Sequence, residues 1–338
     1  MSRRYHMPAE WEPHQGTWLS WPHNPETWPG CLDGAERALA DAVAALAPGE
    51  IVHVNVRDAA ARQALAGRLD GRVGADRVRY HEIPTNDAWC RDHGAIFVRE
   101  GARLIALDFR FNAWGGKYPP FDLDDAAGAR MARALGVECQ RIEMILEGGS
   151  IEVNGAGTVL TTEQCLLNPN RNPTLSRAEI ESALERWLGV SQIVWLGDGI
   201  DGDDTDGHID DITRFVARDT VVTAVEPDPA DVNHAPLAEN LERLRHVRLP
   251  GGKALSIVEL PMPDPLVREG RRLPASYANF YIGNDVVLVP VFGCARDAAA
   301  VAVLGRCFPS RRMVPIDCRD VVVGLGTFHC LTQQVPAA

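Results

Sequence analysis

A thiol, an imidazole and several carboxylates stand in polar segments of the chain, each at the start of a short apolar run. These segments supply Asp92, Glu147, the pair His208 and Asp210, and Cys330 near the carboxyl terminus. A cysteine thiolate is a strong nucleophile, and an imidazole can transfer the proton that a leaving group needs. This combination of side chains predicts nucleophilic catalysis by a thiol.

Local spacing favours one histidine over another as the partner of the thiol. In an extended segment, His208 and Asp210 lie two residues apart and share a face. His329 directly precedes Cys330, so in a strand these two side chains would point to opposite faces. We therefore expect His208, and not His329, to act with Cys330.

Two other interpretations of the polar residues stay open at this point. Cys90 lies beside Asp92 and is a rival nucleophile, although we expect it to be a structural thiol. The stretch DGDDTDGHIDD contains six aspartates in eleven residues and resembles a calcium loop. It fails the EF-hand pattern, because placing Gly207 at loop position 6 puts Gly202 at position 1 and Thr213 at position 12. We expect no metal.

The number of carboxylates indicates the charge of the ligand. Several carboxylates beside a thiol raise its pKa and would repel an anionic intermediate. They are useful if the substrate is a cation, and a planar guanidinium presents paired N–H donors that match bidentate carboxylates. The site therefore favours a small guanidine substrate. A binding protein for cationic ligands, without catalysis, is the alternative class.

A weak repeat positions these segments. Its unit is a polar motif, an apolar strand, a tight turn and a second strand, often followed by a helix, and copies start about 50 to 70 residues apart. Helical periodicity predicts helices within residues 124–136, 177–190 and 296–308. The paired strands of the four copies are WCRDHGAIFV with RLIALDF, LEGGSIEV with TVLTTEQ, GHIDDITRFV with TVVTAV, and SYANFYI with VVLVPVF.

The two ends of the chain complete a fifth copy. Residues 326–334, GTFHCLTQQ, have the pattern of a first strand whose partner is missing downstream, and residues 16–22, GTWLSWP, form an orphan strand. If the units close into a ring, these two strands pair and remove exposed sheet edges. A plain α/β sheet is the alternative, because any strand–helix alternation looks repetitive.

Composition limits the class of protein. The 338 residues are 46% apolar and carry a net charge of −12, which argues against nucleic-acid binding. The eight cysteines form no C-x-x-C pair, the first residues lack the apolar core of a signal peptide, and no apolar run reaches the length of a membrane span. We expect a cytoplasmic protein that binds no membrane. Its size and charge are compatible with a homodimer.

Seven motifs run nearly from end to end of the chain: MPAEWEPHQGTWLSWP, NDAWCRDHG, FNAWGGKYPP, LEGGSIEVNGAGTVLTTEQCLLNPNRNP, DDTDGHIDD, ASYANFYIGN and GTFHCLTQQVP. Together they resemble those of one known family, the agmatine deiminases and bacterial peptidylarginine deiminases among the guanidine-modifying enzymes. The resemblance implies a single domain over residues 1–338, folded as a five-bladed α/β propeller of pseudo-fivefold ββαβ repeats closed by the terminal strands.

The resemblance also implies a role for each matching residue. Cys330 matches the nucleophile, His208 the general acid and base, Asp92 and Asp210 the carboxylates that bind the guanidinium, and Glu147 the acid near the histidine. Further substrate contacts are implied for the two tryptophans that wall the pocket and, with lower weight, for two more acids: Trp89, Trp114, Asp87 and Asp206.

The implied activity is hydrolysis of agmatine to N-carbamoylputrescine and ammonia, through a covalent amidino-thioether and with no cofactor. This reaction would serve putrescine and polyamine synthesis. The chain departs from many agmatine deiminases, with GLGTFHC in place of Gly-Gly-Gly-Asn-Ile-His-Cys and HIDD in place of His-Val-Asp-Asn. Arginine, free or in peptides, or another alkylguanidine therefore stays the alternative substrate, and transfer to an amine ranks after it.

Overall fold

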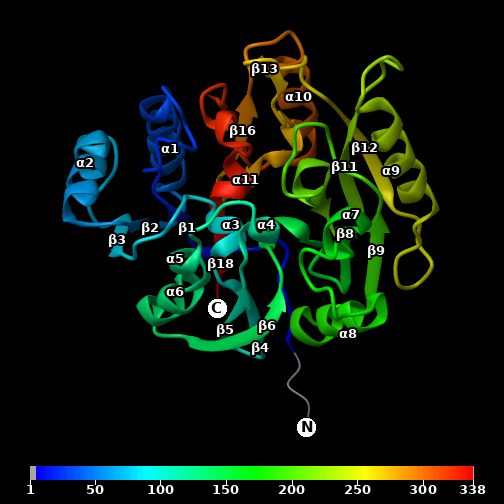
Figure 1. The fold of residues 1–338 in the computed structure, drawn as a ribbon, viewed down its shortest axis with the longest axis horizontal. Helices are drawn as coiled ribbons and strands as arrows, with labels where there is room; N and C mark the ends of the chain where they lie inside the picture. Colours follow the sequence, from blue (N-terminus) through cyan, green and yellow to red (C-terminus); the bar gives the residue numbers. More distant parts are fainter. Residues whose placement is uncertain (1–4, 338) are drawn as a thin grey trace.

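The structure is a computed structural model that describes residues 5–337. Its strands form five larger sheets, one of four strands and four of three strands, and one short hairpin. Figure 1 shows these sheets and their helices placed around the middle of the molecule, where α3, α4 and α11 lie. Each sheet is a separate hydrogen-bonded unit, so the strands of the described residues do not close into one barrel.

The five larger sheets share one strand order. In each, the first strand pairs antiparallel with the second, and the second pairs parallel with the third. Four of them follow chain order, with β4 (Ile96–Glu100), β5 (Arg103–Arg110) and β6 (Glu138–Ile145); β7 (Glu152–Val153), β8 (Thr158–Thr162) and β9 (Gln192–Leu196); β10 (Thr213–Ala217), β11 (Thr220–Val225) and β12 (Ser256–Pro261); β15 (Tyr281–Ile282), β16 (Val286–Val291) and β17 (Arg312–Asp317).

The fifth sheet joins the two ends of the chain. Strand β18 (Thr332–Pro336) pairs antiparallel with β1 (His14–Ser20), as predicted for residues 326–334 and 16–22. The sheet continues with β2 (Ile51–Val56) and β3 (Val78–Glu82), both in parallel register. The last strand of the described chain is therefore an edge strand that is tied to the first strand by an antiparallel ladder.

Helices make the crossovers that parallel pairing requires. The three predicted helices are confirmed, and α8 shows why: Ser176 and Glu179 form a capping box, and Gly189 ends the helix at φ 72°. The helices that connect parallel strands are α1 (Leu32–Leu46), α2 (Ala59–Leu69), α6 (Ala127–Leu135), α8 (Arg177–Leu188), α9 (His234–His246) and α10 (Asp297–Cys307).

A short helical turn precedes the first strand of every larger sheet, where the sequence predicted continuous strand. The prediction of one strand over residues 326–334 was wrong, because Phe328–Leu331 form a turn and the strand begins only at Thr332. Successive side chains in a turn point about 100° apart, so neighbouring residues serve different contacts. The five turns are α3 (Cys90–His93), η1 (Gly148–Ser150), η2 (Ile209–Asp211), η3 (Tyr277–Asn279) and α11 (Phe328–Leu331).

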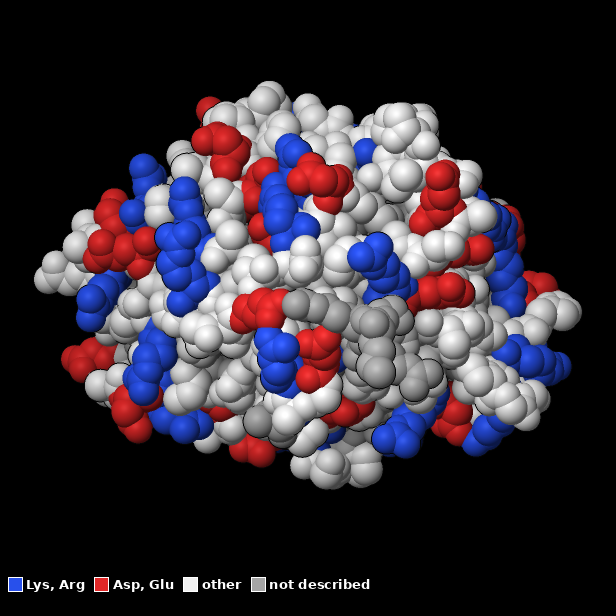
Figure 2. Space-filling model, turned by 90° about the horizontal axis from the view of Figure 1, so that it is seen from below, with Lys and Arg blue, Asp and Glu red and all other residues white. Residues whose placement is uncertain are grey.

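The remaining elements are short and lie in connections. No helix of residues 5–337 is long and apolar enough to cross a membrane. On the face drawn in Figure 2, lysines and arginines alternate with acidic residues, so the described part of that face has no continuous basic surface. The short elements are α4 (Ala113–Gly116), α5 (Asp122–Asp125), α7 (Glu163–Leu166), η4 (Val321–Gly324), and the hairpin of β13 (Val267–Arg268) and β14 (Arg271–Arg272).

Candidate active site

The five helical turns meet one another. Turn α3 contacts η1, η1 contacts η2, η2 contacts η3, η3 contacts α11, and α11 contacts α3. Polar side chains from distant parts of the chain therefore gather in one place, as the repeat predicted. The reason differs from the predicted one, because turns rather than strand ends carry these side chains.

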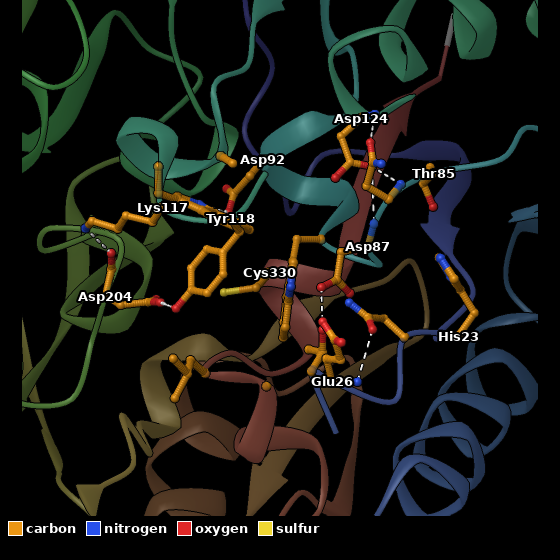
Figure 3. A pocket seen from close by; sticks show the side chains of 18 of the residues that line it. His23, Glu26, Thr85, Asp87, Asp92, Lys117, Tyr118, Asp124, Asp204 and Cys330 are labelled. Atoms are coloured by element: carbon orange, nitrogen blue, oxygen red, sulfur yellow. Dashed lines mark hydrogen bonds between the residues drawn. The ribbon is translucent and has the colours of Figure 1, made fainter. Parts of the chain in front are cut away.

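A cavity of about 980 Å³ opens above the turns. Cys330, Asp92, Trp89, Trp114 and Asp87 line it, which brings together five of the nine predicted site residues. Figure 3 shows the Cys330 sulfur and the Asp92 carboxylate pointing into this space, from α11 and α3. The thiol is 4% exposed, so it lies at the deep end of the cavity and not at its mouth.

Three more predicted residues lie buried behind this wall, namely His208, Asp210 and Glu147. The first two meet Asp92 at Gly149. A side-chain carbon added to Gly149 would lie 2.6 Å from His208 Nδ1, 2.8 Å from Asp92 Oδ1 and 3.1 Å from Asp210 Oδ2. The three side chains thus converge on one glycine, which must lack a Cβ for the site to form. Gly148, the next residue toward Glu147, is equally confined, since its Cβ would lie 2.3 Å from a backbone oxygen.

Fixed donors orient the Asp92 carboxylate. Gly149 N–H donates to Oδ1 at 3.0 Å, and Trp114 Nε1–H donates to Oδ2 at 3.0 Å. Trp114 has φ 53°, a left-handed conformation that is costly for a bulky residue. The strained backbone of α4 therefore places the Trp114 indole where it donates to Asp92 and lines the cavity.

Asn279 and Asp210 flank the thiol. Asn279 Nδ2–H donates to Cys330 Sγ at 3.1 Å, and Asp210 Oδ2 lies 3.6 Å from the same sulfur. The Asn279 Oδ1 atom accepts the backbone N–H of Cys330 at 3.3 Å and of His329 at 3.1 Å. The sequence prediction missed Asn279, although it lies in the fourth copy at the position that carries the acids and the thiol elsewhere.

The acids and the histidine shift each other's ionisation. Burial raises the pKa of Asp92 to about 6, helped by the charges of Asp210 and Glu147 and opposed by His208. Burial opposes charge on His208, yet the Asp92 carboxylate and its other neighbours raise the histidine pKa well above its usual value. His208 therefore carries a proton at neutral pH.

The thiol is neutral in this environment. Burial raises the pKa of Cys330 well above its usual value, and the charges of Asp210, Asp211 and Asp92 raise it further. The Asn279 hydrogen bond opposes this only in part. A cation placed among the carboxylates would remove most of the repulsion and favour the thiolate.

Several buried polar atoms of the site have no hydrogen-bond partner among residues 5–337. They are both ring nitrogens of His208, Oδ1 of Asp210 and Oε2 of Glu147. Buried polar groups in folded proteins are nearly always hydrogen-bonded, so orphans at the end of a cavity indicate a missing polar ligand. The two carboxylate oxygens, Asp210 Oδ1 and Glu147 Oε2, can only accept hydrogen bonds when ionised, which suits a ligand with N–H groups.

Glu147 and Asp206 are both held by one buried arginine. Arg171 Nε–H donates to Glu147 Oε1 at 2.6 Å, and its other nitrogens bind Asp206 and the Thr205 carbonyl. Asp206 also pairs with Lys117 at 2.9 Å and does not line the cavity. The structure therefore does not bring Asp206 into the acidic site, because two cations hold its carboxylate outside.

The two alternative catalytic residues lie elsewhere. Cys90 packs in a hydrophobic cluster away from the cavity, and burial raises its pKa to about 12. The His329 ring contacts Asp210 and Glu10, and does not face the thiol in the way a base would. The argument that placed His329 and Cys330 on opposite faces of a strand was wrong, since the two residues lie in a helical turn.

Two sets of side chains within residues 5–337 have the donor atoms to hold a metal ion. In each set, the three donor atoms lie within 4.8 Å of one another. The sets include Glu147, His208 and Asp210, which also carry the atoms without a hydrogen-bond partner. The sets are Glu147 with Cys165 and His208, and Asp210 with Asp211 and Cys330.

Solved structures identify the class to which this fold belongs. The agmatine deiminase of Enterococcus faecalis matches with a TM-score of 0.93 at 32% identity, covering 98% of this chain and 96% of that one. A substrate-bound cysteine variant of C. jejuni agmatine deiminase matches with a TM-score of 0.90 at 32% identity, covering 99% and 97%. The chain thus has the mixed α/β fold of these enzymes, as expected from the sequence.

Sequence comparison identifies the family within that class. Residues 6–336 match the Porphyromonas-type peptidyl-arginine deiminase family. The agmatine deiminase of Ectopseudomonas mendocina is 39% identical to this chain, with 98% of this chain and 96% of that one covered. The chain belongs to the Porphyromonas-type peptidyl-arginine deiminase family.

Proposed function

We propose that this protein is a C–N hydrolase that converts agmatine and water to N-carbamoylputrescine and ammonia. The observation that carries the proposal is the meeting of four side chains: Cys330 and Asp92 line one end of the cavity, and Asp210 and the His208 imidazole lie buried directly behind them. The choice of substrate is supported by relatives named agmatine deiminase, to which this chain is similar over nearly their whole length.

The guanidinium binds between Asp92 and Asp210. Asp92 is already oriented by Trp114 and the Gly149 N–H, and Asp210 offers the unpartnered Oδ1. Charge-assisted hydrogen bonds from a planar cation to two carboxylates fix its carbon against the sulfur. Trp89 lines the same space and limits the orientations that the flat group can take.

Binding of the cation activates the nucleophile. Its charge offsets the carboxylates that keep the Cys330 pKa high, so the thiol releases its proton to solvent and the thiolate attacks the guanidinium carbon. His208, which enters protonated, donates its proton to the departing amine, and ammonia leaves. An amidino group remains bonded to the sulfur.

Hydrolysis completes the cycle. His208 is now neutral and takes a proton from water as the oxygen adds to the amidino carbon. The carbon–sulfur bond then breaks, and the ureido product leaves together with a regenerated Cys330. Glu147, held by Arg171 and close to His208, supports the positive charge on the ring in both steps. No metal or organic cofactor takes part in this sequence of steps.

The mouth of the cavity bears on the choice between agmatine and arginine. Asp87, Asp204 and Glu26 line it and suit the ammonium tail of agmatine. Arg268 and Arg271, on the β13–β14 hairpin, line it as well and would suit the carboxylate of arginine. The positive charges of Arg268 and Arg271 are the observation that keeps arginine, free or peptidyl, as the second candidate substrate.

A substrate panel tests the proposal. Ammonia release is measured with agmatine, arginine, an arginine peptide and a guanidino acid, each with and without a chelator. We expect kcat/KM for agmatine to exceed the others by roughly tenfold or more, with no effect of the chelator. Faster turnover of arginine would replace agmatine as the substrate. Binding of agmatine without ammonia release from any guanidine would instead make the protein a cation-binding protein.

We also propose that residues 1–338 form one domain, a five-bladed α/β propeller. The common strand order of the five larger sheets, the pairing of β1 with β18 and the cycle of contacts among the turns support this arrangement. We further propose a cytoplasmic homodimer, in keeping with the net charge of −12 and the free cysteines. Light scattering on the purified protein tests the dimer, and a monomeric mass would contradict it.

A further inference from the structure

A buried charged network lies beneath the candidate site, and Glu10 is its centre. The Glu10 carboxylate accepts hydrogen bonds from Arg214 Nη2 at 2.9 Å, Arg91 Nη2 at 3.1 Å and the Ile282 N–H at 2.9 Å. It also lies 2.9 Å from His329 Nε2. All four charged side chains are nearly inaccessible to solvent, with exposures of 4% or less. Such a network must be fully satisfied to be tolerated.

The network takes a member from each of the five larger sheets or from the turn before it. Arg91 belongs to α3, Arg214 to β10 and His329 to α11. Arg214 Nε–H also donates to Glu152 of β7 at 2.7 Å, and its Nη1–H to the Phe280 carbonyl at 2.7 Å, just before β15. The same contacts that hold the sheets together therefore reach the residue beside the thiol.

The His329 ring has a carboxylate at each nitrogen. Nδ1 lies 2.6 Å from Asp210 Oδ2, and Nε2 lies 2.9 Å from Glu10 Oε2. Both acceptors are ionised. Burial opposes this, but Arg214 and His329 hold the pKa of Glu10 well below its usual value, and the hydrogen bond and charge of His329 lower the pKa of Asp210. Carboxylates only accept, so both ring nitrogens must donate, and the ring must carry two protons.

The histidine leaves only one oxygen of Asp210 available. Oδ2 is engaged by His329 and lies 3.6 Å from Cys330 Sγ, whereas Oδ1 is buried and has no partner. We propose, on the basis of the function proposed above, that His329 is a positioning residue: an imidazolium held by Glu10 that fixes Asp210 ionised, with Oδ1 turned toward the guanidinium. The other charged or titratable groups facing Asp210 are His208, Arg214, Asp211, Asp92 and Cys330.

Kinetics of His329→Gln test the role in catalysis. Glutamine cannot bridge two carboxylates as a cation, so Asp210 loses its charged donor and its pKa rises. We expect kcat/KM at neutral pH to fall on the order of 10²-fold, and its acid limb to move to higher pH, with recovery as the pH is raised. A role in stability alone would lower the whole profile without moving the limb. An unmoved limb in a folded variant would therefore overturn the proposal.

A matched control lies just after the turn, at the first residue of β18. The Thr332 hydroxyl donates to the Phe328 carbonyl at 2.6 Å and to the His329 carbonyl at 3.4 Å, so both of these hydrogen bonds go to backbone oxygens and not to a carboxylate. We expect Thr332→Val to lower the thermal midpoint and to leave the acid limb of kcat/KM in place. If the limb moved as far in this variant as in His329→Gln, the effect would belong to the turn and not to the imidazolium.

Nitrogen-15 NMR of the histidines gives a readout that needs no activity. We expect His329 in the unmodified protein to show two protonated ring nitrogens at neutral pH, and Glu10→Gln to abolish this state. The signal is assigned by its loss in His329→Gln or, if that variant does not fold, by its shift in Cys330→Ser. A neutral His329 ring in the unmodified protein would overturn the inference while leaving the proposed function intact. Conversely, absence of ammonia release from every guanidine would overturn the proposed function and leave the doubly protonated state of His329 intact.

Discussion

Two groups of buried acids lie within one small region, and they differ in how well they are satisfied. Glu10 and Glu152 accept hydrogen bonds from arginines and backbone N–H groups at both oxygens. Asp210 and Glu147 each keep one oxygen without a partner, next to an unpartnered histidine. A satisfied carboxylate in the interior holds structure together, whereas an unsatisfied one indicates where a ligand belongs. The comparison separates the buried network around Glu10, Glu152 and Arg214, which we call the hub, from the candidate site next to it.

The largest expected effect is at the thiol. Cys330→Ser keeps the shape of the site but replaces the sulfur by a far weaker nucleophile, so we expect ammonia release from agmatine to fall by roughly 10³-fold or more. Agmatine binding, measured by calorimetry, should survive because the acids are untouched. Near-native turnover in this variant would remove Cys330 from the mechanism.

The satisfied acids should respond in stability. Glu152→Gln removes one of the two carboxylates that pair with the buried Arg214, so we expect the free energy of unfolding to fall by roughly 3 kcal/mol. The denaturant midpoint measures this. Asp92→Asn, its counterpart in the unsatisfied group, should lower kcat/KM on the order of 10²-fold with a much smaller change in midpoint. If both variants behaved alike, the division between hub and site would not hold.

Gly149 tests the convergence of the site directly. The added methyl of Gly149→Ala would meet His208, Asp92 and Asp210, so we expect kcat/KM to fall by roughly 10²-fold. Gly67, in the last turn of α2 with open space around it, provides the control. Gly67→Ala should keep full activity and raise stability by about 0.5–1 kcal/mol. Full activity in Gly149→Ala would mean that catalysis does not depend on the close approach of His208, Asp92 and Asp210 to this residue.

The smallest effect is the pH dependence. Burial raises the Asp92 pKa to about 6, so protonation below that pH removes one charge of the guanidinium clamp. We expect kcat/KM to fall about tenfold per pH unit below this value and to level off above it. The kcat/KM profile of Asp92→Asn should lack this acid limb and keep any pH dependence that comes from other groups. An acid limb that persists unchanged in the variant would assign it to another group.

The sequence alone predicted much of the framework. Hairpin turns and helical periodicity were enough to find the repeat, and the repeat predicted the pairing of the terminal strands. Three- and four-residue turns such as α11 have too few residues to show a period, so they were mistaken for strand. The repeat also predicted which polar positions would meet, without giving the geometry of their meeting.

Long-range ion pairs were beyond prediction. The contact of Glu10 with His329 joins opposite ends of the chain, and nothing in the spacing of either residue indicates it. Asp206 has the same local setting as its acidic neighbours, yet Arg171 and Lys117 divert it from the cavity. Local pattern identifies which residue types gather, whereas the partners that satisfy or divert them depend on the completed fold.

The pairing of β1 with β18 has a consequence for the order of folding. Register partners such as Leu19 and Thr332 come from opposite ends of the chain, and contacts of such separation form slowly. The sulfur stands directly before that last strand, so it meets its acids and histidine only once the two ends have found each other. A half-folded molecule would carry a thiol of ordinary pKa without the carboxylates that hold a substrate beside it, so catalysis would begin only after β1 and β18 have paired.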